Sequence, residues 1–424
     1  MIRMSKNYKR ALGILNKISM SGSRPGFERI NSLLQKLGNP QKNFKCIIVG
    51  GTNGKGSTVT FLSKILECAN YKTGSFFSPH IFSFLERIQI NSELISEDDF
   101  ANLFFEVYEK FEELEDKPTF FETLCAMAFL HFSKNKCDYA VMEVGMGGRL
   151  DATNACEPQL SIITNVSFEH TKHLGDSIEK IAFEKSGIMR ENRPVVIGSC
   201  GDELDVLMQI ANKKGAISHF VKDKFKIKKT NGSKMEINYN FPKPFSAYLN
   251  STADFSANNS ACSAMAAQIL GVENTKIIAG LQSAVLRGRW EKISESPKII
   301  VDCAHNLGAF LQIEPLIKKE FDSDSILLFC AMKDKNYGAE LELLSKYFST
   351  AVFCSLESER SLDVKTLVQA AKKIGFENIH KAKKSQDAFL LAKKLSNEKK
   401  PILICGSIYL LQTLFSNNEI FVSG

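Results

Sequence analysis

The sequence lacks the features that mark several specialised classes of protein. It contains 11 cysteines but no Cys-x-x-Cys pair, and it has no repeat and no low-complexity tract. Its longest apolar stretch, residues 401–415, contains polar side chains and is too short to cross a bilayer. Basic residues exceed acidic residues by only 54 − 47 = 7. These absences argue against a zinc module, a disulfide framework, a membrane protein and a nucleic-acid-binding protein.

What remains is the composition of an ordinary globular protein. With 424 residues, 44% of them hydrophobic and 24% charged, about 150 residues per domain gives two or three domains. Most cysteines lie in apolar runs, as Cys46 and Cys405 do, which predicts buried free thiols in a reducing compartment. The first 18 residues show neither an apolar run nor a small-residue cleavage site, so we expect a cytoplasmic protein.

Short β-branched runs alternate with amphipathic stretches of helical length, a pattern typical of a parallel α/β sheet. Strands are predicted at 46–49, 139–144, 160–164, 194–197, 299–301, 326–330, 351–354 and 402–405. Helices are predicted at 56–69, 120–134, 178–188, 258–270 and 364–374. Residues 219–248 favour a small antiparallel insertion. A turn-rich segment predicts a domain boundary that separates residues 1–293 from 294–424.

A glycine-rich loop follows the first predicted strand and precedes a helix. Glycines let the backbone approach phosphates, and the helix N-terminus adds positive potential. The loop departs from the usual phosphate-binding pattern because a glycine separates its lysine from its serine, and a plain strand–helix turn is the alternative. The predicted phosphate-binding loop, to which the family resemblance given below assigns ATP, consists of Gly51, Thr52, Asn53, Gly54, Lys55, Gly56 and Ser57.

Three further clusters of polar residues follow predicted strands. Glu143 ends a buried strand, where a carboxylate suits a nucleotide-bound magnesium ion, or else an ion pair with Arg149. His170 and His173 follow the next strand, and spacing alone does not choose between a metal ligand and a surface histidine. Lys185 follows Glu184 on a predicted helix, a pair that is by itself typical of a solvated face. The third cluster comprises Asp302 and His305, which follow the predicted strand 299–301, and Arg289, which precedes that strand and stands next to the sole tryptophan, Trp290.

In order along the chain, these motifs resemble the folylpolyglutamate synthase/dihydrofolate synthase family, a branch of the Mur-ligase superfamily. The resemblance covers nearly the whole chain and rests on residues 25–30, 51–57, 78–81, 86–91, 119–122, 147–154, 184–188, 302–306 and 406–409. It implies an N-terminal P-loop-type Mur-ligase central domain with a parallel sheet. It also implies a smaller C-terminal Rossmann-like α/β domain that acts in glutamate ligation.

The resemblance assigns roles to the ambiguous residues. Lys185 matches a lysine that the family carbamylates with CO2, which turns an ammonium into an anionic magnesium ligand. Two Mg²⁺ ions are expected, and catalysis is assigned to Lys185, His170, Glu143 and His305. The implied metal ligands are Ser57, Ser78, Glu143, His170 and Lys185.

ATP contacts outside the loop are implied for Asn259, Arg289 and Asp302. The family's ATP-contacting asparagine could correspond to Asn259 or to Asn258, which precedes it. The family's usual His-Gln pair before this position is replaced here by Phe255-Ser256. The implied substrate-binding residues are Ser78, Pro79, His80, Arg87, Phe121 and Ser407.

The implied activity is ATP-dependent addition of L-glutamate to dihydropteroate, to a reduced folate, or to both, through an acyl phosphate. Partners are then small molecules, with neither nucleic acid nor membrane, and the protein is expected to be a monomer. One alternative is a Mur-type ligase for peptidoglycan precursors, against which residues 78–91 argue. The other is a nucleotide-binding relative that has lost catalysis.

Overall fold

The computed structural model describes residues 5–20, 22, 24–198, 201, 203–229 and 234–415. Their backbone contacts divide the chain into two compact units. The first comprises Met1–His80 and Leu85–Val285, and the second comprises Ile81–Phe84 and Leu286–Gly424. The boundary drawn from the sequence at residue 294 stays a prediction. Strand β12 (Glu291–Glu295), which contains that residue, lies in the second unit.

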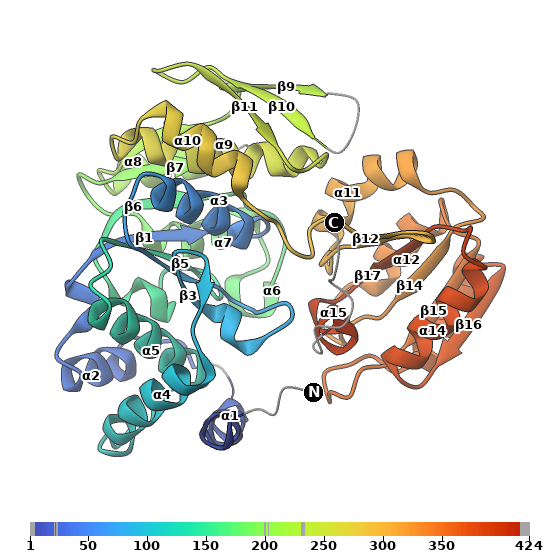
Figure 1. The fold of residues 1–424 in the computed structure, drawn as a ribbon, viewed down its shortest axis with the longest axis horizontal. Helices are drawn as coiled ribbons and strands as arrows, with labels where there is room; N and C mark the ends of the chain where they lie inside the picture. Colours follow the sequence, from blue (N-terminus) through green and yellow to red (C-terminus); the bar gives the residue numbers. More distant parts are fainter. Residues whose placement is uncertain are drawn as a thin grey trace. The chain divides into compact units, whose positions relative to one another are not determined.

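The first unit is built on an eight-stranded sheet with the order β4-β3-β2-β5-β1-β6-β7-β8 in the described part of the chain (Figure 1). The strands from β2 to β8 in this order run parallel, and β3 and β4 add an antiparallel edge. Their bounds are β1 (Lys45–Gly50), β2 (Thr73–Phe76), β3 (Ile88–Ile90), β4 (Glu93–Leu94), β5 (Tyr139–Glu143), β6 (Pro158–Ile163), β7 (Pro194–Ile197) and β8 (Ile217–Phe220).

Helices cover this sheet in separate layers (Figure 1). Helix α3 packs with α9 and α10, whereas α5 packs with α1, α2 and α4. Their bounds are α1 (Lys6–Ser19), α2 (Glu28–Lys36), η1 (Pro40–Lys42), α3 (Lys55–Cys68), η2 (Phe84–Arg87), α4 (Glu97–Glu112), α5 (Phe120–Lys134), η3 (Ala152–Ala155), α6 (Thr171–Leu174), α7 (Ile178–Lys185), η4 (Ser186–Ile188), α8 (Glu203–Lys213), α9 (Asp254–Ile269) and α10 (Asn274–Ser283).

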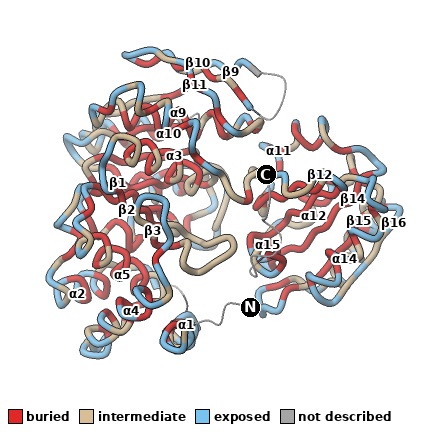
Figure 2. Tube along the Cα trace, viewed as in Figure 1, coloured by how far each residue is buried: buried red, intermediate tan, exposed pale blue. Residues whose placement is uncertain are grey.

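The central strands are apolar because both of their faces are covered. All five residues of β5 are buried, and so are the last five of β1 (Figure 2). Such continuous apolar runs are typical of parallel strands between helix layers. The strand pattern in the sequence predicted this arrangement, and the α/β class with a parallel sheet is confirmed.

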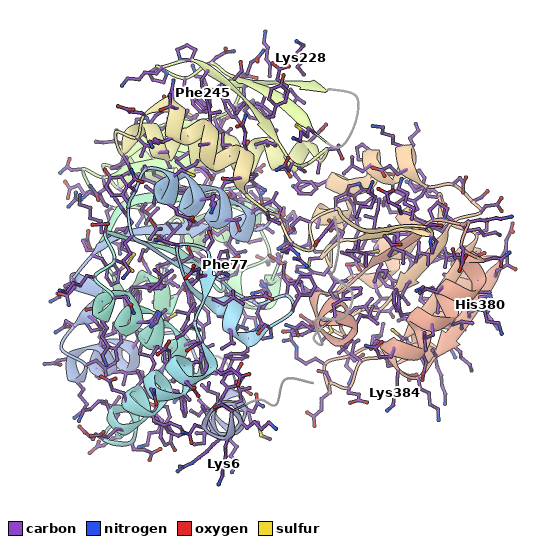
Figure 3. The ribbon with its side chains drawn as sticks, viewed as in Figure 1. Lys6, Phe77, Lys228, Phe245, His380 and Lys384 are labelled. Carbon is purple, nitrogen blue, oxygen red and sulfur yellow. A yellow bond between two sulfur atoms is a disulfide. The ribbon has the colours of Figure 1, made fainter. Side chains whose placement is uncertain are left out.

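A three-stranded antiparallel sheet follows, made of β9 (Phe225–Lys229), β10 (Met235–Tyr239) and β11 (Phe245–Leu249). Alternate residues of β10 are buried, and the ring of Tyr239 stacks on Phe245 with 4.6 Å between centroids. Figure 3 labels Phe245 in this sheet. The antiparallel insertion predicted for residues 219–248 is therefore confirmed from β9 to β11, whereas residues 219 and 220 belong to the parallel strand β8.

The second unit contains a six-stranded sheet in its described residues, with the order β12-β13-β17-β14-β15-β16. Strand β12 is antiparallel to β13 and the others run parallel. The strand bounds are β13 (Lys298–Val301), β14 (Ile326–Phe329), β15 (Thr350–Cys354), β16 (Asn378–Ala382) and β17 (Ile402–Cys405). The helices are α11 (Leu307–Glu320), α12 (Tyr337–Ser345), α13 (Val364–Ile374), α14 (Ser385–Ser396) and α15 (Ile408–Phe415).

Four residues from much earlier in the chain belong to this second unit. Ile81 and Phe82 pack against its apolar core. The ring of Phe82 lies 6.3 Å from that of Phe415, and the Arg287 guanidinium lies 5.2 Å from the centre of the Phe82 ring. The segment directly after the predicted substrate residues 78–80 is thus part of the C-terminal unit.

One expectation about the cysteines is wrong. The structure joins Cys46 and Cys156 in a disulfide, with 6.6 Å between their Cα atoms. Cys46 lies in β1 and Cys156 lies just before β6, the neighbouring strand, so the sheet brings together residues that are 110 positions apart. The eight other described cysteines are free thiols, and all but Cys68 are buried.

Within the described ranges, no helix is both long enough and apolar enough to cross a membrane.

Candidate active site

The glycine-rich loop joins β1 to α3, as predicted, at the carboxyl edge of the first sheet. Gly54 has a φ of 83° and immediately precedes α3, and Gly51 has a φ of 133°. A Cβ atom at Gly51 would lie 2.0 Å from Thr164 Oγ1, and one at Gly54 would lie 2.3 Å from Asn259 Oδ1. Both positions therefore require glycine, for the backbone conformation and for the close approach of neighbouring side chains.

The loop is held by two residues that follow β6, to which the sequence motifs assigned no role. Thr164 Oγ1 donates to the Asn53 carbonyl at 2.7 Å. Asn165 Oδ1 accepts from Asn53 N at 3.0 Å, and its Nδ2 donates to the Asn53 carbonyl at 2.9 Å. Their signal was available, because a Thr-Asn pair at the end of a parallel strand next to β1 must lie beside the loop.

Two buried polar atoms at the loop have no hydrogen-bond partner among the described residues. They are Ser57 Oγ and Asn259 Nδ2, and the two residues are only 3% and 2% exposed. Buried polar atoms are normally satisfied, so unsatisfied ones mark a place for a ligand. A hydroxyl oxygen and an amide donor beside a helix N-terminus suit a metal ion and a phosphate. Asn258, by contrast, donates to the Thr164 carbonyl at 3.4 Å.

Two lysines converge on the same loop. Lys55 Nζ donates to the carbonyls of Gly51 and Thr52 at 3.1 and 2.9 Å, and Lys185 Nζ donates to the Gly51 carbonyl at 2.9 Å. Only 2% of Lys185 is exposed, so the solvated-face interpretation is wrong for it. Burial, and then the charge of Lys55, lower the pKa of Lys185 to about 7, against an opposing effect of Glu169. A large share of this amine is therefore neutral at neutral pH.

Glu143 ends β5 and is buried beside the loop. Its Oε2 accepts from Ser78 N at 2.9 Å and would lie 3.3 Å from a Cβ atom placed at Gly56. Arg149, the ion-pair partner considered as an alternative, pairs with Glu184 at 2.8 Å instead. The carboxylate thus lies where the phosphate loop and the 78–80 segment approach each other.

Segment 78–80 and Arg87 form a connected polar group. Arg87 Nε donates to His80 Nδ1 at 2.9 Å, and Arg87 Nη1 lies 3.5 Å from Ser78 Oγ. Burial, with the Arg87 charge as a second cause, lowers the pKa of His80 to about 3. His80 is therefore a neutral imidazole whose Nδ1 accepts a hydrogen bond. Pro79 follows Ser78 through a cis peptide bond.

The start of α5 lies against these residues. The Phe121 ring is 5.8 Å from the ring of Phe76, the last residue of β2, and it would lie 2.6 Å from a Cβ atom at Gly145. Arg87 is 5.8 Å from the centre of the Phe120 ring. Phe121 is thus placed between the ends of β2 and β5, next to the segments that carry Ser78 and Glu143.

His170 lies in the segment after β6. It adopts a left-handed conformation with a φ of 51° and immediately precedes α6, and its Nε2 is 3.9 Å from Glu169 Oε1. The described ranges contain no group of three or more histidine, cysteine, aspartate or glutamate residues arranged to hold a metal. The predicted metal set depends instead on serine hydroxyls and a modified lysine in addition to Glu143 and His170.

The remaining predicted residues lie in the second unit. Asp302 follows β13, and its carboxylate accepts from Ala304 N and Trp290 N, both at 2.7 Å. Burial raises the pKa of Asp302, and Arg289 is the largest opposing influence. Ser407 follows β17, which is parallel to β13, so Asp302 and Ser407 share one edge of the sheet.

Two other residues of this unit have clear contacts. His305 Nδ1 is 2.8 Å from the Cys303 carbonyl. Trp290 packs edge-on against Phe321 and bonds Glu320 through its indole nitrogen at 3.1 Å, which supports a packing role.

Residues 49–267 match the Mur ligase middle domain, and residues 288–408 match the Mur ligase glutamate ligase domain. Over 412 residues the chain is 33% identical to the dihydrofolate synthase/folylpolyglutamate synthase of Bacillus subtilis, covering 93% of this chain and 95% of that protein. The chain belongs to the dihydrofolate synthase/folylpolyglutamate synthase family. The family resemblance in the motifs is thereby confirmed.

Solved structures of this family agree with the fold. A Mycobacterium tuberculosis folylpolyglutamate synthase complexed with ADP and AMPPCP superposes with a TM-score of 0.90 at 26% identity, covering 96% of this chain and 98% of that one. The Escherichia coli protein FolC, solved with DHPP and ADP, gives 0.84 at 25% identity, with 97% of each chain covered. The predicted fold, a P-loop-type Mur-ligase domain followed by a smaller α/β domain, and the ligase class are confirmed.

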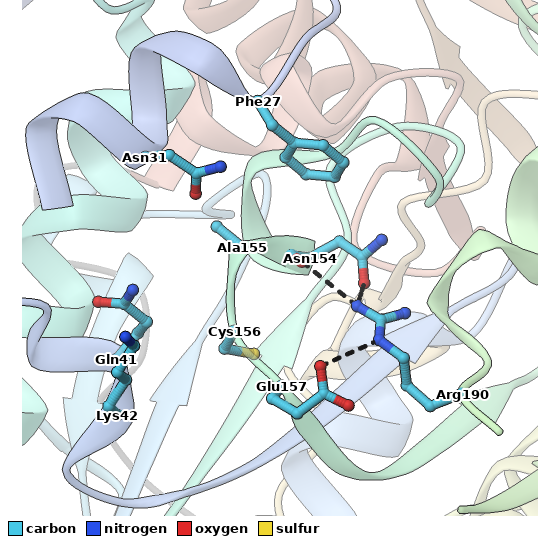
Figure 4. Close-up of a pocket in the computed structure, with 9 residues that line it drawn as sticks. All are labelled: Phe27, Asn31, Gln41, Lys42, Asn154, Ala155, Cys156, Glu157 and Arg190. Carbon is cyan, nitrogen blue, oxygen red and sulfur yellow. Dashed lines mark hydrogen bonds and ion pairs between the residues drawn. The ribbon is translucent and has the colours of Figure 1, made fainter. Parts of the chain in front are cut away.

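A separate pocket in the first unit contains none of the residues predicted to act in catalysis or to bind ATP, metal or substrate (Figure 4). It is lined by Phe27, Lys42, Glu157 and Arg190, among others. Arg190 donates to Asn154 Oδ1 at 2.8 Å and to Glu157 at 3.3 Å. These bonds join the segment before β6 to the segment before β7, which supports a structural role for Arg190.

Proposed function

We propose that the protein is an ATP-dependent ligase that joins L-glutamate to the carboxylate of a pterin acid. The observation that carries the proposal is the buried group at the phosphate loop: the unpartnered Ser57 Oγ and Asn259 Nδ2 together with the perturbed amine of Lys185. Its relatives include enzymes named for both dihydrofolate synthesis and folate polyglutamylation.

The reaction is expected in two steps. The pterin carboxylate attacks the γ-phosphorus of ATP, which gives an acyl phosphate and ADP. The amine of glutamate then attacks the acyl carbon, phosphate leaves and an amide forms. In the first step the loop amides, the N-terminus of α3 and Lys55 would stabilise the negative charge of the phosphoryl group during its transfer.

Magnesium fits the residues present. Ser57, Ser78, Glu143, His170 and Lys185 would hold two ions, and a bound ion would neutralise phosphate charge and orient the γ-phosphate. The unsatisfied Ser57 hydroxyl and the buried Glu143 carboxylate support this set, since oxygen donors are what magnesium prefers.

Lys185 is proposed to act as a carbamate. Its neutral amine would attack CO2, forming an N–C bond and releasing one proton, and the product is an anion. The lowered pKa supports this role, because only the neutral amine is a nucleophile. Without the modification, a buried cation next to Lys55 would repel a metal ion.

The acceptor substrate is assigned to Ser78, Pro79, His80, Arg87 and Phe121. Arg87 would attract the substrate carboxylate, and the neutral His80 holds the arginine by accepting from Nε. In the second unit we propose Arg289 and Asp302 as ATP contacts, and His305 and Ser407 as residues for phosphate and glutamate.

We propose both activities for the one chain, with dihydropteroate and reduced folates as alternative acceptors. The test is phosphate release from ATP with each acid in the presence of glutamate. Turnover with one acid alone refutes bifunctionality. Turnover with a nucleotide-linked sugar peptide would favour the peptidoglycan alternative, and no acid-dependent release with any acceptor would favour the non-catalytic one.

A monomeric state and a cytoplasmic location are part of the proposal. Light scattering of the purified chain should give a mass near 47.3 kDa, and the mass of a dimer would overturn the monomeric state. Fractionation of the cells that produce the protein checks the cytoplasmic location.

A further inference from the structure

Arg29 forms a buried, doubly bonded ion pair with Glu122. Arg29 lies in the first turn of α2, and its Nε and Nη2 donate to the two carboxylate oxygens of Glu122 at 3.1 and 3.0 Å. Only 8% and 5% of the two side chains are exposed. A paired guanidinium and carboxylate in this two-point geometry fixes orientation as well as distance.

Glu122 also caps helix α5. Its Oε2 accepts from Thr119 N at 2.6 Å, while Thr119 Oγ1 accepts from Glu122 N at 3.3 Å, which completes a capping box. One carboxylate therefore joins α2 to the first turn of α5. Arg29 additionally donates to the Arg24 carbonyl and lies 3.6 Å from Asp116 Oδ2, so it contacts the chain on both sides of this junction.

The first turn of α5 contacts the part of the candidate site that is assigned to the acceptor acid. Phe121 packs on Phe76 and Gly145, and Phe120 lies under Arg87. A shift of this turn would therefore move Phe121 and the support beneath Arg87. The phosphate loop is fixed by other elements, namely β1, α3 and the residues after β6.

We propose that Arg29 and Glu122 are positioning residues for the acceptor acid. They hold the first turn of α5 in place, so that Phe121 and Arg87 keep the geometry that binds the pterin acid, and they leave the nucleotide loop unaffected. This inference rests on the proposed function, because it requires that the acceptor binds at Phe121 and Arg87.

The test compares four variants by steady-state phosphate release, with the pterin acid and ATP titrated separately. Arg29→Met removes the ion pair with Glu122. Arg29→Lys keeps the positive charge but loses the two-point hydrogen bonding of the guanidinium. Glu122→Gln keeps the size of the side chain but removes its negative charge. Lys36→Met is the matched control, because Lys36 lies on the same helix and forms an exposed ion pair with Glu113 at 2.9 Å. Circular dichroism melting curves set an assay temperature at which each variant is folded.

We expect Arg29→Met to raise the KM for the pterin acid about tenfold or more while the KM for ATP stays within about twofold, since small displacements of positioned groups cost this much. Arg29→Lys and Glu122→Gln should give intermediate rises, and Lys36→Met none. If Arg29→Met does not fold, the other two variants decide by the same ratio. The inference is overturned if Arg29→Met leaves the KM for the pterin acid unchanged, or if it raises the KM for ATP by the same factor. Wild-type protein without pterin-dependent release refutes the proposed function instead.

Discussion

Lys185 gives the sharpest prediction, because its burial has opposite consequences for activity and stability. Its pKa is lowered from 10.5 to about 7. At pH 7 about half of the amine is then neutral, against about 0.03% for an ordinary lysine, a gain of about a thousandfold in the form that reacts with CO2. Lys185→Met should therefore abolish ligase activity, and added bicarbonate should not restore it.

The same burial destabilises the unmodified protein. The native state binds fewer protons at this group than the unfolded chain between pH 7 and 10.5, so its stability rises with pH across that window. The cost at pH 7 is on the order of 4 kcal/mol. In CO2-free buffer, Lys185→Met should unfold at a higher temperature than wild type at pH 7, and this advantage should disappear near pH 10.5.

The control is Lys180→Met, on the same helix but exposed and paired with Asp176 at 2.8 Å. Its stability should change by less than about 0.5 kcal/mol, as for most surface substitutions. Activity of Lys185→Met that survives and still depends on bicarbonate would refute the carbamate role. Equal melting temperatures of wild type and Lys185→Met at pH 7 would refute the stability argument.

Three further changes probe other parts of the structure. Gly54→Ala should raise the KM for ATP at least tenfold, because its Cβ atom would lie 2.3 Å from Asn259 Oδ1 and its φ is 83°; an unchanged KM would contradict the loop assignment. Ser57→Ala should shift the magnesium dependence of phosphate release to higher concentration without lowering thermal stability, since Ser57 Oγ has no protein partner in the described chain; loss of stability with normal magnesium dependence would speak against it. Burial raises the pKa of Glu340 from 4.5 to about 7, so native stability should fall as pH rises through that interval. Glu340→Gln should therefore be more stable at pH 8 by on the order of 3 kcal/mol, with no difference near pH 4, and equal urea midpoints at pH 8 would refute this.

The sequence allowed prediction of features that depend on local pattern. Strands of the central sheet are continuous apolar runs, and parallel strands bring their carboxyl ends to one edge, which placed the loop at 51–57 and Glu143 there. Strand β7, helix α5 and helix α13 match their predicted bounds. Strands at the edge of the sheet, such as β3 and β4, are too short to show a pattern.

Features that depend on pairs distant in the chain could not be read from spacing. The Cys46–Cys156 disulfide is formed by strand neighbours 110 residues apart. The Arg29–Glu122 pair spans 93 residues, and each partner looks like an ordinary surface charge in its own helix. The burial of Lys185 is likewise set by the elements packed around it, which is why the motif alone suggested a solvated face.

The most direct test of the proposed function is phosphate release by the purified chain with ATP, magnesium, L-glutamate and either dihydropteroate or tetrahydrofolate. We predict release that depends on both the pterin acid and glutamate, with one amide formed per phosphate, for each acid. Phosphate release that is independent of the acid, or no release with either acid, would contradict the assignment of this site to glutamate ligation.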